Sequence, residues 1–276
     1  MLSCTKQQKN GCEIVNRQYD LIVPIGAACS CTSTLRIKNL QYFSYPFDWL
    51  FGAGFLNRVK ILANNFENWL NIEDLEIVGT RQYPRHSNIY LNKKTDITYN
   101  HDFMTDTPLD VEFPLVKEKY DRRINRVINQ IENSDNVLFV YIERPDIRKD
   151  LSDEELKEGY ELLKNRFPNV DINILYTFSI PDVNYKERKI SNISEHIIRI
   201  DLDYDEHNKE YPFNVDIKKV IKVFKNISIS DKFLNSKQKL YRKIDKLPNF
   251  IIKLERYEDY IRVILFNLIS FRIHTK

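Results

Sequence analysis

Four short apolar runs, separated by segments with helical spacing, constrain the fold of this chain more than any other feature. Each run is rich in branched apolar residues and is short enough to be a buried strand. The runs cover residues 21–25, 137–142, 171–178 and 197–202. Apolar residues recur with helical spacing in residues 29–40, 55–66, 109–133, 152–167 and 215–224. Strands that alternate with helices in this way predict an α/β fold with a mostly parallel sheet covered by helices.

Two segments interrupt the alternation. Residues 88–91 and 97–101 are β-prone and flank a polar turn, which predicts an inserted β-hairpin. Near the C-terminus, apolar residues recur at three- and four-residue intervals among Lys and Arg, which predicts a basic amphipathic helical tail. These apolar residues are Leu240, Ile244, Leu247, Ile251, Leu254 and Tyr257. We therefore divide the chain into a flexible N-terminal segment (1–18), an α/β catalytic-type domain (19–230) and a C-terminal helical tail (231–276).

The first strand–helix junction places a cysteine at a special position. The apolar run ends at Ile25, Gly26 and two alanines allow a tight turn, and Cys29 begins the predicted helix. A thiol there faces the backbone N–H groups and the positive end of the helix dipole, which favour the thiolate. Cysteine is also among the residue types that most often fill buried space. The junction alone therefore leaves open both an activated nucleophile and a packed side chain.

Other kinds of chemistry have weaker support in the sequence. The four cysteines lie within the first 31 residues and lack the spacing of a zinc module. Gly26 stands alone, so neither a dinucleotide-binding loop nor a P-loop is present. We therefore expect neither a metal nor a cofactor. The first residues lack the apolar core of a signal peptide, and no run reaches the roughly 18 apolar residues of a membrane span, so we expect a cytoplasmic protein.

Several motifs resemble a bacterial family described as papain-like cysteine peptidases. They are Ile25-Gly-Ala-Ala-Cys29, Tyr45-Pro-Phe-Asp-Trp49, Asn100-His-Asp-Phe103 and Val137-Leu-Phe-Val140, within residues 19–225. The resemblance implies a cysteine–histidine enzyme, either a hydrolase or an acyl transferase. Members of the family often accompany genes for surface polysaccharides. Papain sets a helical half against an antiparallel barrel half, so for the architecture we retain the parallel sheet that the alternation predicts.

The resemblance assigns roles to particular residues. Cys29 is the expected nucleophile and His101, in the Asn-His-Asp-Phe motif, the expected base; a surface hairpin histidine is the alternative reading of His101. Asp48, set between aromatic residues, could orient His101 or cap the next helix. The residues that we assign to substrate binding lie at the turn, in the aromatic motif and after two strands. They are Gly26, Trp49, Arg144 and Asp203.

Two functions of other classes remain open. Asp201, Asp203 and Asp205, with His207 nearby, lie at a strand end, where acidic residues can bind a divalent metal and a nucleotide diphosphate. This pattern would suit a glycosyltransferase or another surface-polysaccharide biosynthesis protein, with Cys29 merely packed. A non-catalytic binding module of such a system is the third reading.

Charge is distributed unevenly along the chain. Residues 232–276 contain eleven Lys and Arg against four Asp and Glu, a net charge of +7 in a chain whose total is +3. The tail could lie on an anionic membrane, which would place the protein peripherally at the inner face, or its helices could pack on the domain or on a second subunit. We expect a peptide or a glycan-linked acyl group as substrate. Nucleic acid is excluded as a partner, because the basic charge is confined to the tail.

Overall fold

The computed structural model describes residues 13–82, 85–143, 151–181, 189–204, 217–245, 252–256, 260–265 and 269–274. The chain divides into two compact units, Met1–Ser230 and Asp231–Lys276, and each is described by itself. The first unit contains the main sheet and the candidate site.

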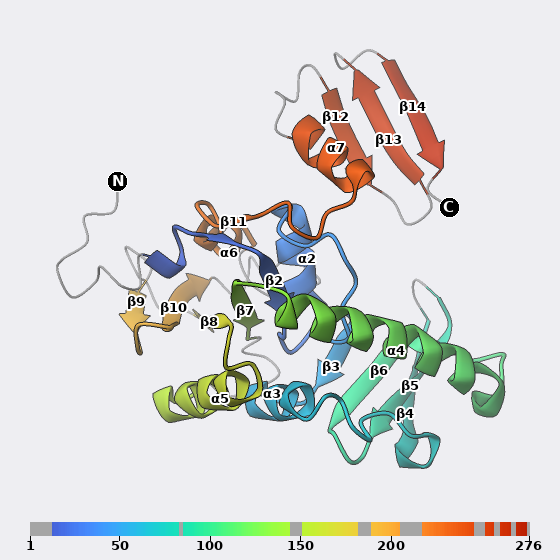
Figure 1. Cartoon of the computed structure of the whole chain (residues 1–276). Helices are drawn as coiled ribbons and strands as arrows, with labels where there is room; N and C mark the ends of the chain where they lie inside the picture. Colours follow the sequence, from blue (N-terminus) through green and yellow to red (C-terminus); the bar gives the residue numbers. More distant parts are fainter. Residues whose placement is uncertain are drawn as a thin grey trace. The chain divides into compact units, whose positions relative to one another are not determined.

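The main sheet has five strands in the order β2-β7-β8-β10-β9 (Figure 1). Strands β2, β7, β8 and β10 are parallel, and β9 pairs antiparallel with β10 at one edge. The strands are β2 (Leu21–Pro24), β7 (Asn136–Ile142), β8 (Asp171–Pro181), β10 (Ile197–Tyr204) and β9 (Lys189–Asn192). All four apolar runs are therefore strands, and the predicted α/β fold with a mostly parallel sheet is confirmed. A short parallel pair, β1 (Gln18–Tyr19) with β11 (Ser228–Ile229), lies apart from this sheet.

One face of the main sheet packs against α2 (Cys29–Ile37) and α6 (Ile217–Val223). The shared core contains alternate residues of β7, because side chains of a strand point to opposite faces in turn. Its members include Ile14, Ile22, Cys31, Leu35, Leu138, Val140, Ile142, Val220 and Phe224. Residues 13–18, which the sequence pattern groups with a flexible N-terminal segment, thus contribute a buried side chain, Ile14.

The opposite face packs against α3 (Phe55–Ala63) and α5 (Asp153–Arg166), which contact each other. The rings of Phe55 and Tyr141 meet edge to face at 5.4 Å between centroids. Gly159 lets α5 approach, since a Cβ there would lie 2.2 Å from the Phe55 ring. Ser152 and Glu155 form a capping box at the start of α5, as the sequence predicts.

A second, antiparallel sheet lies between α2 and β7 in the chain. Its order is β3-β6-β5-β4, with β3 (Leu50–Gly52), β6 (Ile97–Met104), β5 (Ser87–Asn92) and β4 (Leu75–Arg81). The predicted hairpin is therefore confirmed as β5 and β6 and extended by a strand on each side. The long helix α4 (Leu109–Glu132) contacts β6, and the rings of Tyr99 and Tyr120 lie 5.7 Å apart.

The second unit corrects the predicted helical tail. Within the described part of this unit, α7 (Ser236–Asp245) is the only helix, and β12 (Ile252–Arg256), β13 (Tyr260–Leu265) and β14 (Ile269–His274) form an antiparallel sheet (Figure 1, red). Residues 260–273 are rich in Ile, Val and Phe, which favour strands. Ile252 and Leu254, which lie two residues apart, fit the alternation of a strand instead. Among the described residues, no helix is long and apolar enough to cross a membrane.

Candidate active site

The candidate site is built on the junction between β2 and α2. The pairing of β2 with β7 continues past the strand end, because the Ile25 N–H donates to Val140 O at 2.9 Å. A Cβ added at Gly26 would lie 2.5 Å from Cys31 Cβ and 3.3 Å from the backbone nitrogen of Ile142. Only glycine therefore lets α2 begin so close to the sheet. The structure gives Gly26 this packing role, and its assignment to substrate binding stays a prediction.

Cys29 is the first residue of α2. Ala28 before it is extended, with φ −159° and ψ 179°, and contributes no side-chain cap. The residue is buried, with 7% of its surface exposed, and it is a free cysteine rather than part of a disulfide. Backbone N–H groups at the start of a helix point outward along its axis, and with the helix dipole they stabilise negative charge there. The structure thus confirms the position of Cys29 at the start of α2, and the activation of its thiol stays a prediction.

Cys31, two residues later, lies in a different environment. Its Sγ donates to Val140 O at 3.3 Å, and its side chain belongs to the core between α2 and the sheet. Burial raises the pKa of the Cys31 thiol to about 12. Cys31 is therefore a neutral packing residue at physiological pH, and the two cysteines of α2 serve as an internal comparison.

Asp48 holds the aromatic turn against α2. Its carboxylate is fully buried and accepts hydrogen bonds from the side chains of Thr32 and Gln41 and from the Tyr45 N–H, all within 3.0 Å. Arg36 adds an ion pair at 3.3 Å. Burial raises the pKa of Asp48, while Arg36 and the hydrogen bonds oppose that rise. These contacts fix the first two turns of α2.

The observed contacts correct one of the two readings of Asp48. Helix α3 has Gly54 as its N-cap, so Asp48 does not cap it. His101 is not among the described partners of Asp48, so an orienting role stays a prediction. The sequence did carry a signal for the observed network, because Thr32 and Arg36 are four residues apart and share a helix face.

His101 lies on β6 of the antiparallel sheet. Arg81 Nη1 lies 3.0 Å from its Nε2 and 3.4 Å from its Nδ1. Burial lowers the pKa of His101, and the charge of Arg81 lowers it further. The neighbouring Asp102 instead pairs with Lys119 and accepts from Tyr120 Oη. The imidazole is thus neutral, and one of its nitrogens can accept a proton. The Arg81 guanidinium, however, lies against the ring nitrogens in this structure.

The remaining predicted site residues have varied outcomes. Trp49 receives the guanidinium of Arg36 over its ring, 5.6 Å from the centroid. Asp203 lies within β10, in register with Ile180, rather than after the strand. Arg144, Asp205 and His207 lie outside the described residues. Asp201 is almost fully buried and ion-paired with Arg199 at 2.8 Å, so the negative charge of its carboxylate is already balanced by a guanidinium.

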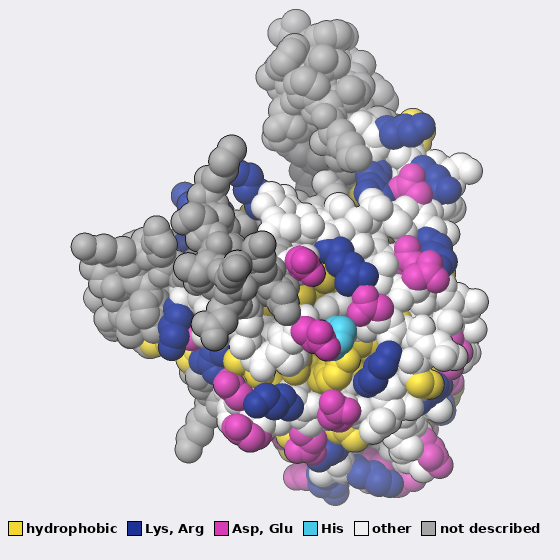
Figure 2. Space-filling view, turned by 60° about the vertical axis from the view of Figure 1, so that its left-hand side comes forward, with side chains coloured by type: hydrophobic (Ala, Val, Ile, Leu, Met, Phe, Trp, Pro, Cys, Tyr) yellow, Lys and Arg dark blue, Asp and Glu magenta, His cyan; other side chains and the backbone are white. Residues whose placement is uncertain are grey.

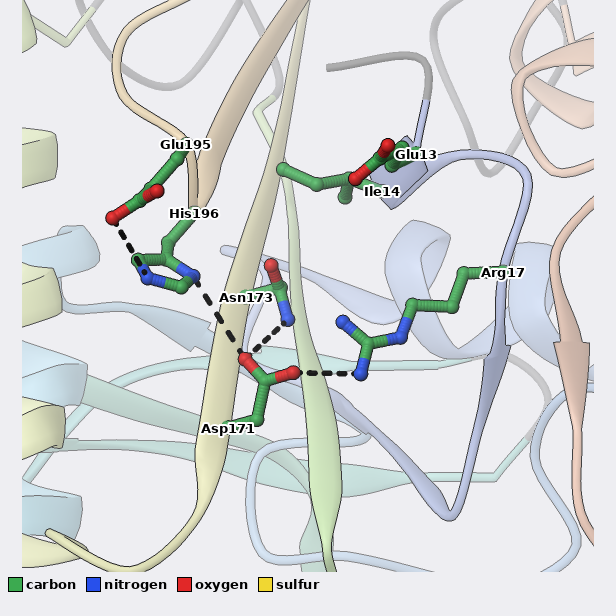
Figure 3. Close-up of a pocket in the computed structure, with 7 residues that line it drawn as sticks. All are labelled: Glu13, Ile14, Arg17, Asp171, Asn173, Glu195 and His196. Atoms are coloured by element: carbon green, nitrogen blue, oxygen red, sulfur yellow. Dashed lines mark hydrogen bonds and ion pairs between the residues drawn. The ribbon is translucent and has the colours of Figure 1, made fainter. Parts of the chain in front are cut away.

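A separate polar pocket lies at the end of the main sheet where β8 and β10 begin (Figure 3). Its volume is about 310 Å³. Asp171, the first residue of β8, pairs with Arg17 at 2.6 Å and accepts from Asn173. His196, which precedes β10, lies between Asp171 and Glu195. The strands of a parallel sheet all begin at one end of the sheet and finish at the opposite end. This pocket lies where β8 and β10 begin, whereas Cys29 follows the carboxyl end of β2, so the pocket is not part of the Cys29 site.

The coloured surface in Figure 2 mixes the two signs of charge. Lys and Arg side chains alternate there with Asp and Glu, with small apolar areas between them. A continuous basic area suited to a polyanion is not visible among the coloured residues on this face. Among the described residues, no group of three or more His, Cys, Asp or Glu is arranged to hold a metal ion.

Comparisons with known proteins give one result. Residues 20–179 match the model of the family described as Putative papain-like cysteine peptidase (DUF1796). Comparisons with curated proteins and with solved structures gave no match. The matched residues begin just before β2 and end within β8, so they include Cys29, the Asp48 turn and His101. They cover more than half of the chain, and the protein therefore belongs to this family.

Proposed function

We propose that the protein is a cysteine-nucleophile enzyme, a hydrolase or acyl transferase, in which Cys29 attacks a carbonyl group. The observation that carries the proposal is the position of Cys29 as the first residue of α2, at the carboxyl end of β2. In open parallel sheets, ligands bind at the carboxyl ends of the strands. The family membership supports the same chemistry.

The proposed reaction has two steps. The base takes the proton of the Cys29 thiol, the thiolate attacks the carbonyl carbon of a peptide or glycan-linked acyl substrate, and the protonated base gives that proton to the leaving group as the C–X bond breaks. Water or a second acceptor then attacks the thioester and releases the thiolate. Asp48 acts indirectly in this proposal, because it holds α2 and thereby the position of Cys29.

For the base we propose His101, whose neutral ring suits the role. A neutral imidazole has one nitrogen that can accept a proton, and Arg81 lies against that edge of the ring. The proposal therefore requires Arg81 to leave the ring before His101 takes the thiol proton. His101→Gln should lower the rate of acylation at pH 7, whereas Arg81→Ala should maintain or raise it. A strong loss of rate in Arg81→Ala would count against His101 as the base.

The test of the proposed function is to trap the acyl-enzyme. The protein is mixed with 4-nitrophenyl acetate, and intact mass and peptide mapping locate any acetyl group. We expect wild type to carry one acetyl group, as a thioester on Cys29. The Cys29→Ser variant should form no acetyl thioester. Ser236→Ala, in the second unit, is the matched control and should behave as wild type. Acetylation that is spread over lysines, with Cys29 unmodified, would refute the proposal.

The glycosyltransferase alternative has less support. Of its acidic cluster, Asp201 is already neutralised by Arg199, and a carboxylate held in this way is a poor metal ligand. If the alternative holds, Mn²⁺ with a nucleotide sugar should raise the melting temperature, and Asp203→Asn should abolish the rise.

A further inference from the structure

Two hydroxyl groups on α2 are buried without a hydrogen-bond partner. They are the Oγ of Ser30 and the Oγ1 of Thr34, in side chains that are 1% and 0% exposed. Nearly all buried polar atoms in proteins are hydrogen-bonded, so each exception has a structural or functional reason. Ser33, on the same helix, is partly exposed and has no such requirement.

The positions of the two hydroxyls differ in one important respect. Ser30 is the second residue of α2 and directly follows Cys29, whereas Thr34 lies one turn further along. The Cα–Cβ bonds of a helix tilt toward its N-terminus, which places the Cβ of Ser30, in the first turn, on the side of the helix start. The backbone N–H groups of the first turn point to the same place, and no side chain caps them at Ala28. Of the two buried hydroxyls without a partner, Ser30 is therefore the one in the first turn of α2, next to Cys29.

We propose that the hydroxyl of Ser30 donates a hydrogen bond to the oxyanion that forms when Cys29 attacks a carbonyl carbon. This inference rests on the proposed function and adds a catalytic residue to it. In the step, the thiolate sulfur forms a bond to the carbonyl carbon, and the π electrons of the C=O bond move to the oxygen. The new oxyanion lies at the start of α2, and its collapse re-forms C=O and expels the leaving group.

The absence of a partner in the free protein is what this role requires. A donor that gains its acceptor only when the oxyanion forms stabilises the transition state more than the ground state, and such binding accelerates the reaction. Burial strengthens the effect, because few water molecules compete for the hydroxyl.

The experiment compares two reagents that differ in one feature. Acylation by 4-nitrophenyl acetate passes through a tetrahedral oxyanion, whereas alkylation by iodoacetamide requires the thiolate but forms no oxyanion. We expect Ser30→Ala to lower the acylation rate of Cys29 about 100-fold, as loss of one oxyanion donor does elsewhere, and to leave alkylation unchanged. Ser30→Thr keeps the hydroxyl and should retain much of the acylation rate.

Two control variants separate this role from simple packing. Ser33→Ala removes a partly exposed hydroxyl of the same helix, and Thr34→Val removes the other buried hydroxyl without a partner. Both should acylate like wild type, and melting curves verify that each variant is folded.

Three outcomes would overturn the inference. If Ser30→Ala acylates as fast as wild type, Ser30 is only packed, and the proposed function stands. If acylation and alkylation fall equally, Ser30 acts on the thiolate and not on an oxyanion. If wild-type Cys29 reacts with neither reagent, the proposed function fails, and this inference fails with it.

Discussion

Replacing Gly26 by alanine should disturb the fold and the candidate site together. The added Cβ would lie 2.5 Å from Cys31 Cβ, whereas carbon atoms in contact prefer about 3.5–4.0 Å. The first turn of α2 must therefore move by about 1 Å, and Ile142 of β7 blocks retreat on the other side. Overpacking of this kind costs about 1–3 kcal/mol. For a domain of this size, that lowers Tm by about 2–12 °C.

The same shift should affect the chemistry of Cys29. A displacement of about 1 Å in a reacting group can cost about 100-fold in rate, so acylation of Gly26→Ala should fall even where the protein remains folded. The assays are thermal unfolding and the acylation rate at a temperature well below Tm. Gly79→Ala is the matched control, because its Cβ would meet only Ile89 Cδ1, at an ordinary 3.7 Å. A Gly26→Ala protein with wild-type Tm and acylation rate would refute the packing argument.

Three further predictions concern Asp48, His101 and the second unit. Asp48→Asn should lower the free energy of unfolding, measured in urea, by on the order of 3 kcal/mol, because it weakens hydrogen bonds to a buried charge. Asp106→Asn, at an exposed position, should lower it little, and equal unfolding curves for the two variants would contradict the network. The pKa of His101 is lowered in the folded protein, so on acidification the unfolded chain takes up this proton at a higher pH than the folded protein does. Stability should therefore fall as the pH drops below about 6.5. His101→Gln should flatten that pH dependence, and an unchanged slope would contradict the assignment. If the basic second unit binds anionic membranes, the full chain should sediment with anionic liposomes at low salt, and a chain ending at Ser230 should not; equal sedimentation would exclude the membrane role.

Local patterns were sufficient for much of the fold. The four parallel strands of the main sheet coincide with the apolar runs, and the capping box at Ser152 marks the start of α5 without help from the rest of the chain. The hairpin of β5 and β6 was predictable because its two strands are close in sequence. Strand β3 was missed, because its pairing with β6 depends on a partner that local periodicity does not show.

The second unit shows where local patterns mislead. Apolar spacing around residue 254 fits a helix as well as a strand, and the choice depends on the antiparallel pairing of β12 with β13. That pairing is a property of two separate segments together, so nothing within residues 252–256 alone contradicted the helical interpretation.

The candidate site was predictable at one residue and not at its surroundings. The place of Cys29 follows from a strand pattern that changes to a helix pattern at a turn of small residues. The contact between Gly26 and Ile142 joins residues 116 positions apart, and Arg81 reaches His101 across the second sheet. Such contacts are created by the fold, so the sequence pattern alone left the partners of His101 and Asp48 undetermined.

The most direct test of the account is the pH dependence of Cys29 alkylation by iodoacetamide in the folded protein. Peptide mapping follows Cys29, Cys31 and the two cysteines near the N-terminus, Cys4 and Cys12, in the same sample. We expect Cys29 to react with a midpoint well below the ordinary cysteine pKa of about 8.5, and Cys31 to stay unmodified until the protein unfolds. A Cys29 midpoint at or above that of Cys4 and Cys12 would contradict the claim that the start of α2 activates this thiol.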